Sequence, residues 1–137
     1  MLQSEFNTLS PDHFKGEAWF KQGSALKYEV DVISLEQFCA QQRISPQIIK
    51  IDVEGAEWQT VQGLEGLLKE PKPIIILEYV VGNEDFSKIF TFMGNYGMRA
   101  FLLEAGGELK EVAGFDVLER LMETDSENLV FLADGRV

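Results

Sequence analysis

An alternation of strand-like and helix-like segments in the middle of the chain constrains the fold more than any other feature. Residues 47–53 read QIIKIDV, a strand pattern enriched in isoleucine, and residues 74–81 read IIILEYVV, a nearly continuous apolar run typical of a strand covered on both faces. Between them, apolar residues recur at a helical period over residues 54–69. Strands that alternate with helices form βαβ units and a parallel sheet, so we expect an α/β fold.

The N-terminal part carries weaker patterns. Residues 1–27 show no clear period and predict an irregular lead-in. Residues 27–33 alternate apolar and polar side chains, as a half-buried strand does. Ser34 and Gln37 then form a capping box, which predicts a helix over about residues 35–43.

The C-terminal part is expected to complete the sheet. The apolar spacing predicts a helix over residues 84–97 and a short amphipathic helix over residues 115–123. Residues 98–112 read as a β-hairpin around two glycines, and residues 128–133 as a closing strand. We therefore expect a mostly parallel sheet with an antiparallel C-terminal edge, in one domain that spans residues 1–137.

Composition excludes several classes of partner. The net charge is −11 at pH 7, which argues against nucleic acid and anionic membrane surfaces, because both attract basic patches. The N-terminal residues have no secretory pattern, and no apolar stretch approaches the ~18 residues that a membrane span needs. The single cysteine, Cys39, leaves no intramolecular disulfide and fits a reducing compartment. We expect a cytoplasmic protein.

Three acidic residues follow the first central strand, at the place where open α/β sheets bind ligands, outside the carboxyl ends of the strands. Asp52 ends that strand on the same face as Lys50, which can pair with an acid. Glu54 lies in the turn, and Glu57 lies in the first helical turn, where the helix dipole favours a carboxylate. Gly55 allows a tight turn or a close backbone approach there.

Each candidate also has a structural interpretation. Glu57 is chiefly a helix-terminus charge, Glu54 is either a solvated loop acid or functional, and Asp52 is the strongest functional candidate because it sits at the strand end itself. Three acids at one edge could bind a divalent cation, but no metal-ligand spacing is present, so we expect no metal site. His13 reads as a surface residue and Cys39 as a small buried hydrophobe.

Three successive segments resemble the C-terminal half of FkbM-type methyltransferases: VDVISLEQF, then IIKIDVEGAEWQTVQGLEGLL, then KPIIILEYV. In that family, [IL]-K-I-D-V-E-G-x-E marks one strand end, and P-x-[IL]-[IL]-x-E marks the next strand. The resemblance covers about residues 28–133 and departs mildly at Glu36, where the family commonly has Asp. The positions that match the family pattern are Lys50, Asp52, Glu54, Gly55, Glu57, Gly63 and Glu78.

The resemblance implies a partial class I methyltransferase sheet, which is Rossmann-like, and methyl transfer from S-adenosylmethionine to a hydroxyl of a small molecule or sugar. Asp52 or Glu54 would accept the proton or orient the acceptor. Cofactor-binding residues stay unassigned, because family members carry upstream a glycine-rich turn and a ribose-binding acid that this sequence lacks. The residues expected to bind substrate or to support the site are Lys50, Gly55, Glu57 and Glu78.

Lack of the N-terminal cofactor-binding strands would leave the strand at residues 47–53 with an open edge, which proteins usually protect. The segment that includes residues 27–33 would cover this edge, or a second copy of the chain would pair there to form a homo-oligomer. Two alternatives to a working methyltransferase stay open: a non-catalytic remnant or interaction module, and an unrelated α/β enzyme with an acidic site.

Overall fold

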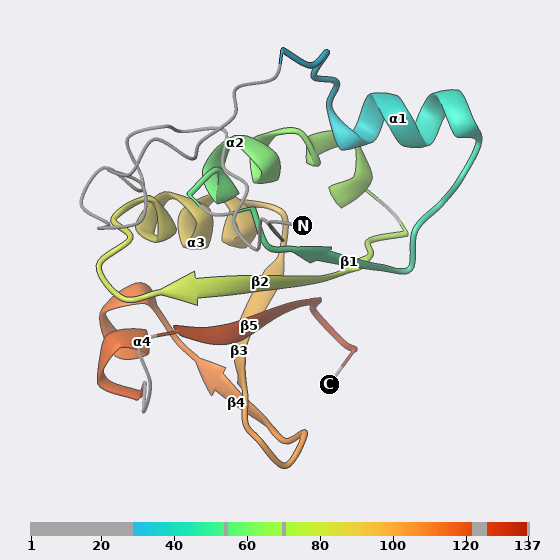
Figure 1. The fold of residues 1–137 in the computed structure, drawn as a ribbon. Coiled ribbons are helices and arrows are strands. Elements are labelled where there is room, and N and C mark those ends of the chain that lie inside the picture. Colours follow the sequence, from blue (N-terminus) through green and yellow to red (C-terminus); the bar gives the residue numbers. More distant parts are fainter. Residues whose placement is uncertain (1–28, 54, 70, 122–125, 137) are drawn as a thin grey trace.

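The computed structural model describes residues 29–53, 55–69, 71–121 and 126–136, and Figure 1 shows their arrangement. Helices and strands alternate through the middle of the chain, and strands predominate after it. In chain order the elements are α1 (Leu35–Gln42), β1 (Ile48–Ile51), α2 (Glu57–Gln62), the 3-10 helix η2 (Glu65–Leu68), β2 (Ile74–Val80), α3 (Asp85–Asn95), β3 (Met98–Leu103), β4 (Leu109–Val112), α4 (Phe115–Leu121) and β5 (Ser126–Ala133).

The described strands form a five-stranded sheet in the order β1-β2-β5-β3-β4. β1 and β2 run parallel, while β5 is antiparallel to both β2 and β3, and β3 and β4 form the predicted hairpin. The α/β fold and the antiparallel C-terminal edge are therefore confirmed. The expectation of a mostly parallel sheet is wrong, because β5, the last strand in sequence, inserts between β2 and β3 and runs against both.

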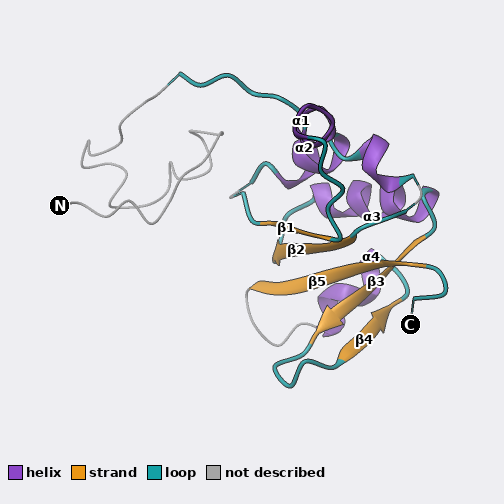
Figure 2. Ribbon diagram, turned by 90° about the vertical axis from the view of Figure 1, so that its right-hand side faces the viewer, coloured by secondary structure: helices purple, strands orange, loops and turns teal. Residues whose placement is uncertain are grey.

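The main core lies between the helices and one face of the sheet, and Figure 2 shows α1, α2 and α3 together on that side. Along β1 and β2, every second side chain points into this core, as period-two alternation requires. α3 contributes Phe86, Ile89 and Met93, which lie on one helical face and are fully buried, as its apolar spacing predicts. The ring of Phe86 packs edge-on against Tyr79, with ring centroids 4.6 Å apart.

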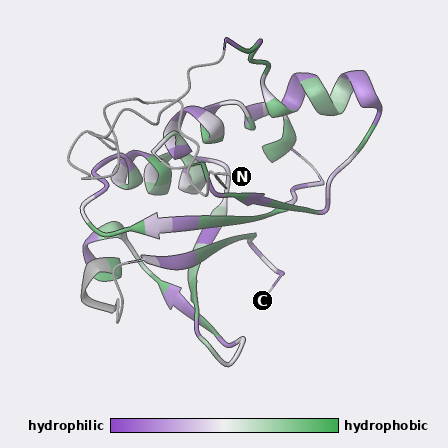
Figure 3. Ribbon diagram, in the orientation of Figure 1, coloured by the Kyte–Doolittle hydropathy of each residue, from purple (hydrophilic) through white to green (hydrophobic). Residues whose placement is uncertain are grey.

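The second face of the sheet carries a smaller apolar cluster, built from strands alone among the described residues. Phe101, Val130 and Leu132 are buried there, and Ile74 and Ile76 are partly buried against them. β2 is therefore fully covered on one face only, and the prediction that it is covered on both is met in part. Figure 3 shows β2 as hydrophobic over its first part and paler toward its arrowhead, where the strand approaches the candidate site.

Two N-terminal predictions have different outcomes. The helix after Ser34 is confirmed, and its N-cap is the predicted one, since the Ser34 hydroxyl accepts the Gln37 N–H at 3.1 Å. The strand predicted over residues 27–33 is wrong for its described part, residues 29–33, which form no strand and leave Val32 73% exposed. Alternation alone does not make a strand, because the ladder needs a neighbouring strand to pair with.

The helix predicted over residues 54–69 begins at Glu57 and ends at Gln62, and the 3-10 helix η2 follows it. Gly63 and Leu64 separate the two helices, because glycine disfavours a continued helix. Residues 1–27, with the predicted irregular lead-in, lie outside the described residues. None of the helices in the described ranges combines the length and apolar character that crossing a bilayer requires.

Candidate functional site

The carboxyl ends of β1 and β2 lie side by side, because the two strands are parallel and paired in register. Ile51 pairs with Leu77, so the next residues along, Asp52 and Glu78, are neighbours on the second face of the sheet. Their carboxyl groups hydrogen-bond to each other. Two acids that are 26 positions apart in the sequence therefore meet at the place where the sequence predicts a ligand site.

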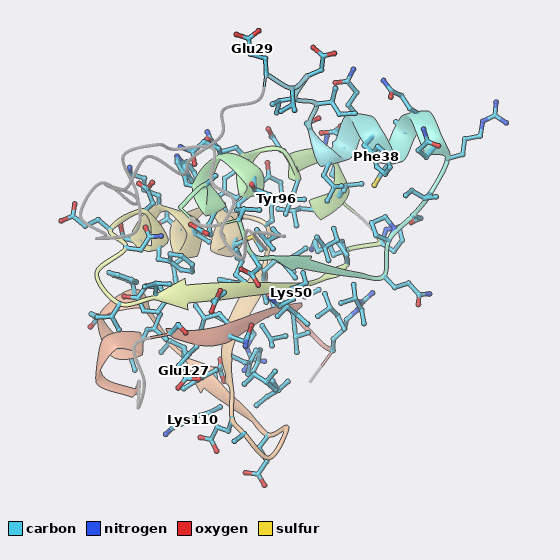
Figure 4. All side chains as sticks on the ribbon, viewed as in Figure 1. Glu29, Phe38, Lys50, Tyr96, Lys110 and Glu127 are labelled. Carbon is cyan, nitrogen blue, oxygen red and sulfur yellow. The ribbon has the colours of Figure 1, made fainter. Side chains whose placement is uncertain are left out.

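Lys50 on β1 holds Asp52 in its ionised form (Figure 4 labels Lys50). The Lys50 ammonium donates a hydrogen bond of 2.6 Å to Asp52 Oδ2, as the shared strand face predicts. This bond is the main reason that the pKa of Asp52 lies below its usual value, and the hydrogen bond with Glu78 also lowers that pKa, although burial opposes the shift. Because both side chains are about half exposed, solvent and salt weaken the pair.

Glu78 behaves in the opposite way. Burial raises the pKa of Glu78, and the hydrogen bond to Asp52 and the negative charge of Asp52 raise it further. Ser126 and Lys50 act against this shift but do not reverse it. The pKa values of the two neighbouring carboxyl groups are therefore shifted in opposite directions. This difference allows one acid to stay ionised while the other exchanges a proton.

Glu57 has a different environment from the other acids. Of the described residues it is the one charged side chain that is buried, with 6% of its surface exposed. Its Oε1 accepts the Gly55 N–H at 3.1 Å, and its Oε2 accepts Asn83 Nδ2 at 3.2 Å. Gly55 has a φ of 92°, which glycine adopts without strain, so the predicted tight turn is present. Glu57 is the first residue of α2, as expected, and it also links two loops.

Asn83 is a site residue that sequence reasoning missed. It lies between β2 and α3, where its Oδ1 accepts the Asp85 N–H at 3.1 Å while its Nδ2 donates to Glu57. One amide therefore orders the start of α3 and ties it to the start of α2. The available signal was local: asparagine directly before a helical segment is a favoured capping residue.

An open cavity of about 460 Å³ lies over the carboxyl end of β2, and its volume falls in the range of small-molecule sites. Four of the lining residues are acidic, which favours a ligand with positive charge or with hydrogen-bond donors. The lining residues are Gly55, Glu57, Glu78, Val80, Val81, Gly82, Asn83, Glu84 and Asp85.

The structure thus gathers Lys50, Asp52 and Glu78 on one face of the sheet edge, and Gly55 and Glu57 beside the cavity that Glu78 also lines. Glu54 lies outside the described residues. Within the ranges that the structure describes, no group of three or more His, Cys, Asp or Glu side chains could hold a metal ion.

Comparison with known proteins adds one match. The family model described as the methyltransferase FkbM domain matches residues 3–106, which is most of the 137-residue chain. The match includes residues 3–27, which the sequence motifs left out of the resemblance. No curated protein and no solved structure matches the chain. The chain belongs to the FkbM methyltransferase domain family.

Proposed function

We propose that this chain takes part in methyl transfer from S-adenosylmethionine to a hydroxyl group of a small molecule or sugar, at the carboxyl ends of β1 and β2. Family membership supports the reaction class. The observation that carries the assignment of the site is the hydrogen-bonded pair of Asp52 and Glu78, whose pKa values shift in opposite directions beside an open cavity.

When bound, S-adenosylmethionine supplies an electrophilic methyl group, and the acceptor hydroxyl must lose its proton as the new C–O bond forms. A carboxylate is a better general base when its pKa lies closer to the working pH. Lys50 lowers the pKa of Asp52 and so makes it a weaker base, whereas burial raises the pKa of Glu78 and makes it a stronger one. We therefore assign proton acceptance to Glu78, and we assign to Asp52, the first candidate from the sequence, the role of orienting Glu78 and the acceptor.

The cavity residues suit the cofactor in charge and size. S-adenosylmethionine carries a sulfonium and an ammonium group, and carboxylates at a cavity wall attract such cations. A volume of about 460 Å³ is large enough for a ligand of this kind. The residues that would face its positive charges are Glu57, Glu78, Glu84 and Asp85.

Isothermal titration calorimetry with S-adenosylmethionine tests this proposal. We expect micromolar affinity for the wild-type chain and several-fold weaker binding for Glu78→Gln, which removes one charge from the cavity wall. Glu108→Gln is the matched control, because Glu108 is exposed in the β3–β4 turn. Absence of binding by the wild-type chain would refute the proposal and favour the interaction module.

We further propose that a second copy of the chain pairs with the outer edge of β1. No strand in the described part of the chain pairs there, because β1 ends the sheet. The opposite edge carries two charged residues among the four of β4, which reads Leu-Lys-Glu-Val. β1 reads Ile-Ile-Lys-Ile and has one charged residue, Lys50, and the exposed apolar side chains of Phe38, Ile44 and Ile48 lie on α1, on the segment that leads into β1 and at its first residue.

The sequence of β1 selects a register for this pairing. Residues opposite each other across an antiparallel pair share a face, so a two-fold axis can lie at Ile49 or at Lys50. An axis at Lys50 would place two ammonium groups opposite each other, which is unfavourable. With the axis at Ile49, each Ile48 faces Lys50 of the second copy.

Charge substitutions at Ile48 test both the dimer and its register. Sedimentation of the wild-type chain at about 100 μM should give a dimer, Ile48→Lys should give a monomer, and Ile48→Glu should keep the dimer through an ion pair with Lys50. Leu109→Lys, at the exposed edge residue of β4, should sediment like the wild type. A wild-type monomer would refute the pairing.

A further inference from the structure

A row of polar side chains crosses three adjacent strands on the second face of the sheet. Asp52 lies beside Glu78, and Glu78 is directly opposite Asn128 in the antiparallel pairing of β2 with β5. The next pair toward the centre of the sheet, Ile76 opposite Val130, is apolar and belongs to the cluster on that face. The polar row therefore forms the rim of an apolar surface, where water is partly excluded.

Asn128 holds an acceptor that has no donor. Its Oδ1 is buried and is the one buried side-chain nitrogen or oxygen of the described residues without a hydrogen-bond partner. Such atoms are rare in folded proteins, and each costs about 1–3 kcal/mol when it stays unpaired. A donor placed close to Asn128 would remove this cost.

Glu78 is the side chain placed to supply that donor. Residues directly opposite each other in an antiparallel pair have Cβ atoms about 4.5–5.5 Å apart, so side chains of this length can share a hydrogen bond. A carboxyl group donates a hydrogen bond only when it is protonated. The buried acceptor of Asn128 therefore matches the neutral form of Glu78 and has nothing to accept from the ionised form.

We propose that Asn128 is a positioning residue that accepts a hydrogen bond from the protonated carboxyl group of Glu78 and so stabilises the proton on Glu78. The bond would satisfy the orphan acceptor at no cost to the β-sheet. The single proton of Glu78 would then be shared between two acceptors, the Asp52 carboxylate on one side and Asn128 Oδ1 on the other.

The groups that face Glu78 fit this assignment. Lys50 and Ser126 favour the ionised form, while burial and Asp52 favour the neutral form, and the balance raises the pKa of Glu78. The hydrogen bond to Asn128 would further favour the neutral form of Glu78. The acidic residues that line the adjacent cavity also oppose a further negative charge there; besides Glu78 they are Glu57, Glu84 and Asp85.

The consequence for catalysis rests on the proposed function. If Glu78 accepts the proton of the acceptor hydroxyl, Asn128 tunes that base toward the working pH. The reverse orientation of the Asn128 amide makes the opposite prediction, because its Nδ2 would donate to the ionised carboxylate and lower the pKa of Glu78. The sign of the effect of Asn128 on Glu78 therefore distinguishes the two arrangements.

Carboxyl-carbon NMR titration of Glu78 tests the inference without any need for catalysis. Asn128→Ala and Asn128→Leu both remove the acceptor, and each should weaken the proton affinity of Glu78 by roughly three- to tenfold, the equivalent of one hydrogen bond. Ser126→Ala is the control of opposite sign, since loss of its bond to the ionised form should strengthen proton affinity. Glu78→Gln assigns the resonance.

An unchanged or strengthened proton affinity in both Asn128 variants would overturn the inference. If neither variant folds, infrared spectroscopy of the wild-type chain decides: the band of protonated Glu78 should lie at the frequency of a hydrogen-bonded carboxyl group, and a free-carboxyl frequency would overturn the inference. Where activity is measurable, the acid limb of the pH profile should move to lower pH in Asn128→Ala. If the Asn128 variants keep the wild-type proton affinity of Glu78 and also keep normal activity, the inference is wrong while the proposed function still holds.

Discussion

Replacing Glu57 by glutamine keeps the shape of the side chain and removes its charge. The carbonyl oxygen of the new amide can still accept the Gly55 N–H, but the amide nitrogen would then face Asn83 Nδ2, donor against donor. Asn83 cannot turn its amide to compensate, because its Oδ1 already accepts the Asp85 N–H. One hydrogen bond is therefore lost, and the other loses its charge assistance.

The expected loss follows from these bonds. A hydrogen bond to a charged group contributes about 1.5–3 kcal/mol, and removal of a buried charge recovers part of that by avoiding its desolvation. We expect Glu57→Gln to lower the free energy of unfolding by about 1–2 kcal/mol, or Tm by roughly 4–8 °C for a chain of this size. Urea unfolding followed by tryptophan fluorescence measures the change, and Trp58 lies next to the substituted residue.

Two comparisons make this measurement decisive. Glu108→Gln, on the exposed turn, should change the free energy of unfolding by less than about 0.5 kcal/mol. The double variant Glu57→Gln with Asn83→Ala should lose less than the sum of the two single variants, because the two side chains share a bond. If Glu57→Gln matches the Glu108→Gln control, the link between the two loops does not stabilise the fold and the reasoning is refuted.

Two further predictions concern the same edge. Gly82 has a φ of +85°, and no atom lies within 4 Å of a Cβ added there. Gly82→Ala should therefore lower the free energy of unfolding by about 1 kcal/mol through backbone strain alone. Gly106 is equally open and has no positive φ, so Gly106→Ala should leave thermal unfolding unchanged. Because the folded-state pKa of Glu78 is raised, its stabilising contribution is present below its unfolded pKa and is lost as pH rises through the folded pKa. Glu78→Gln should therefore melt at a higher temperature than the wild type at pH 7 and at a similar temperature near pH 3.5, and a difference that does not grow with pH would contradict this.

Local patterns in the sequence were sufficient to predict several features of the central part of the fold. The alternation in β1 correctly placed Lys50 and Asp52 on one face of the strand, and this shared face predicted their ion pair. The cap of α1 at Ser34 was predictable for the same reason, since each of these features involves residues within a few positions of one another.

Features that depend on distant parts of the chain could not be predicted. The insertion of β5 between β2 and β3 places Asn128 opposite Glu78, 50 positions away in the sequence, and no local pattern indicates that contact. The buried environment of Glu57 depends in the same way on Asn83 from the next loop. The alternation over residues 29–33 misled because it specifies a strand only where a partner is available.

Transfer of a labelled methyl group from S-adenosylmethionine to a panel of hydroxyl compounds tests whether the chain is a methyltransferase with Glu78 as its general base. We expect label in an acceptor with the wild-type chain and with Glu108→Gln, and a loss of about 10²-fold or more with Glu78→Gln, the size expected for removal of a general base. Since Glu78→Gln should be at least as stable as the wild type at pH 7, unfolding would not explain that loss. Equal transfer by Glu78→Gln and the wild type would rule out Glu78 as the general base, and no transfer by the wild type to any acceptor would rule out the proposed methyltransferase activity.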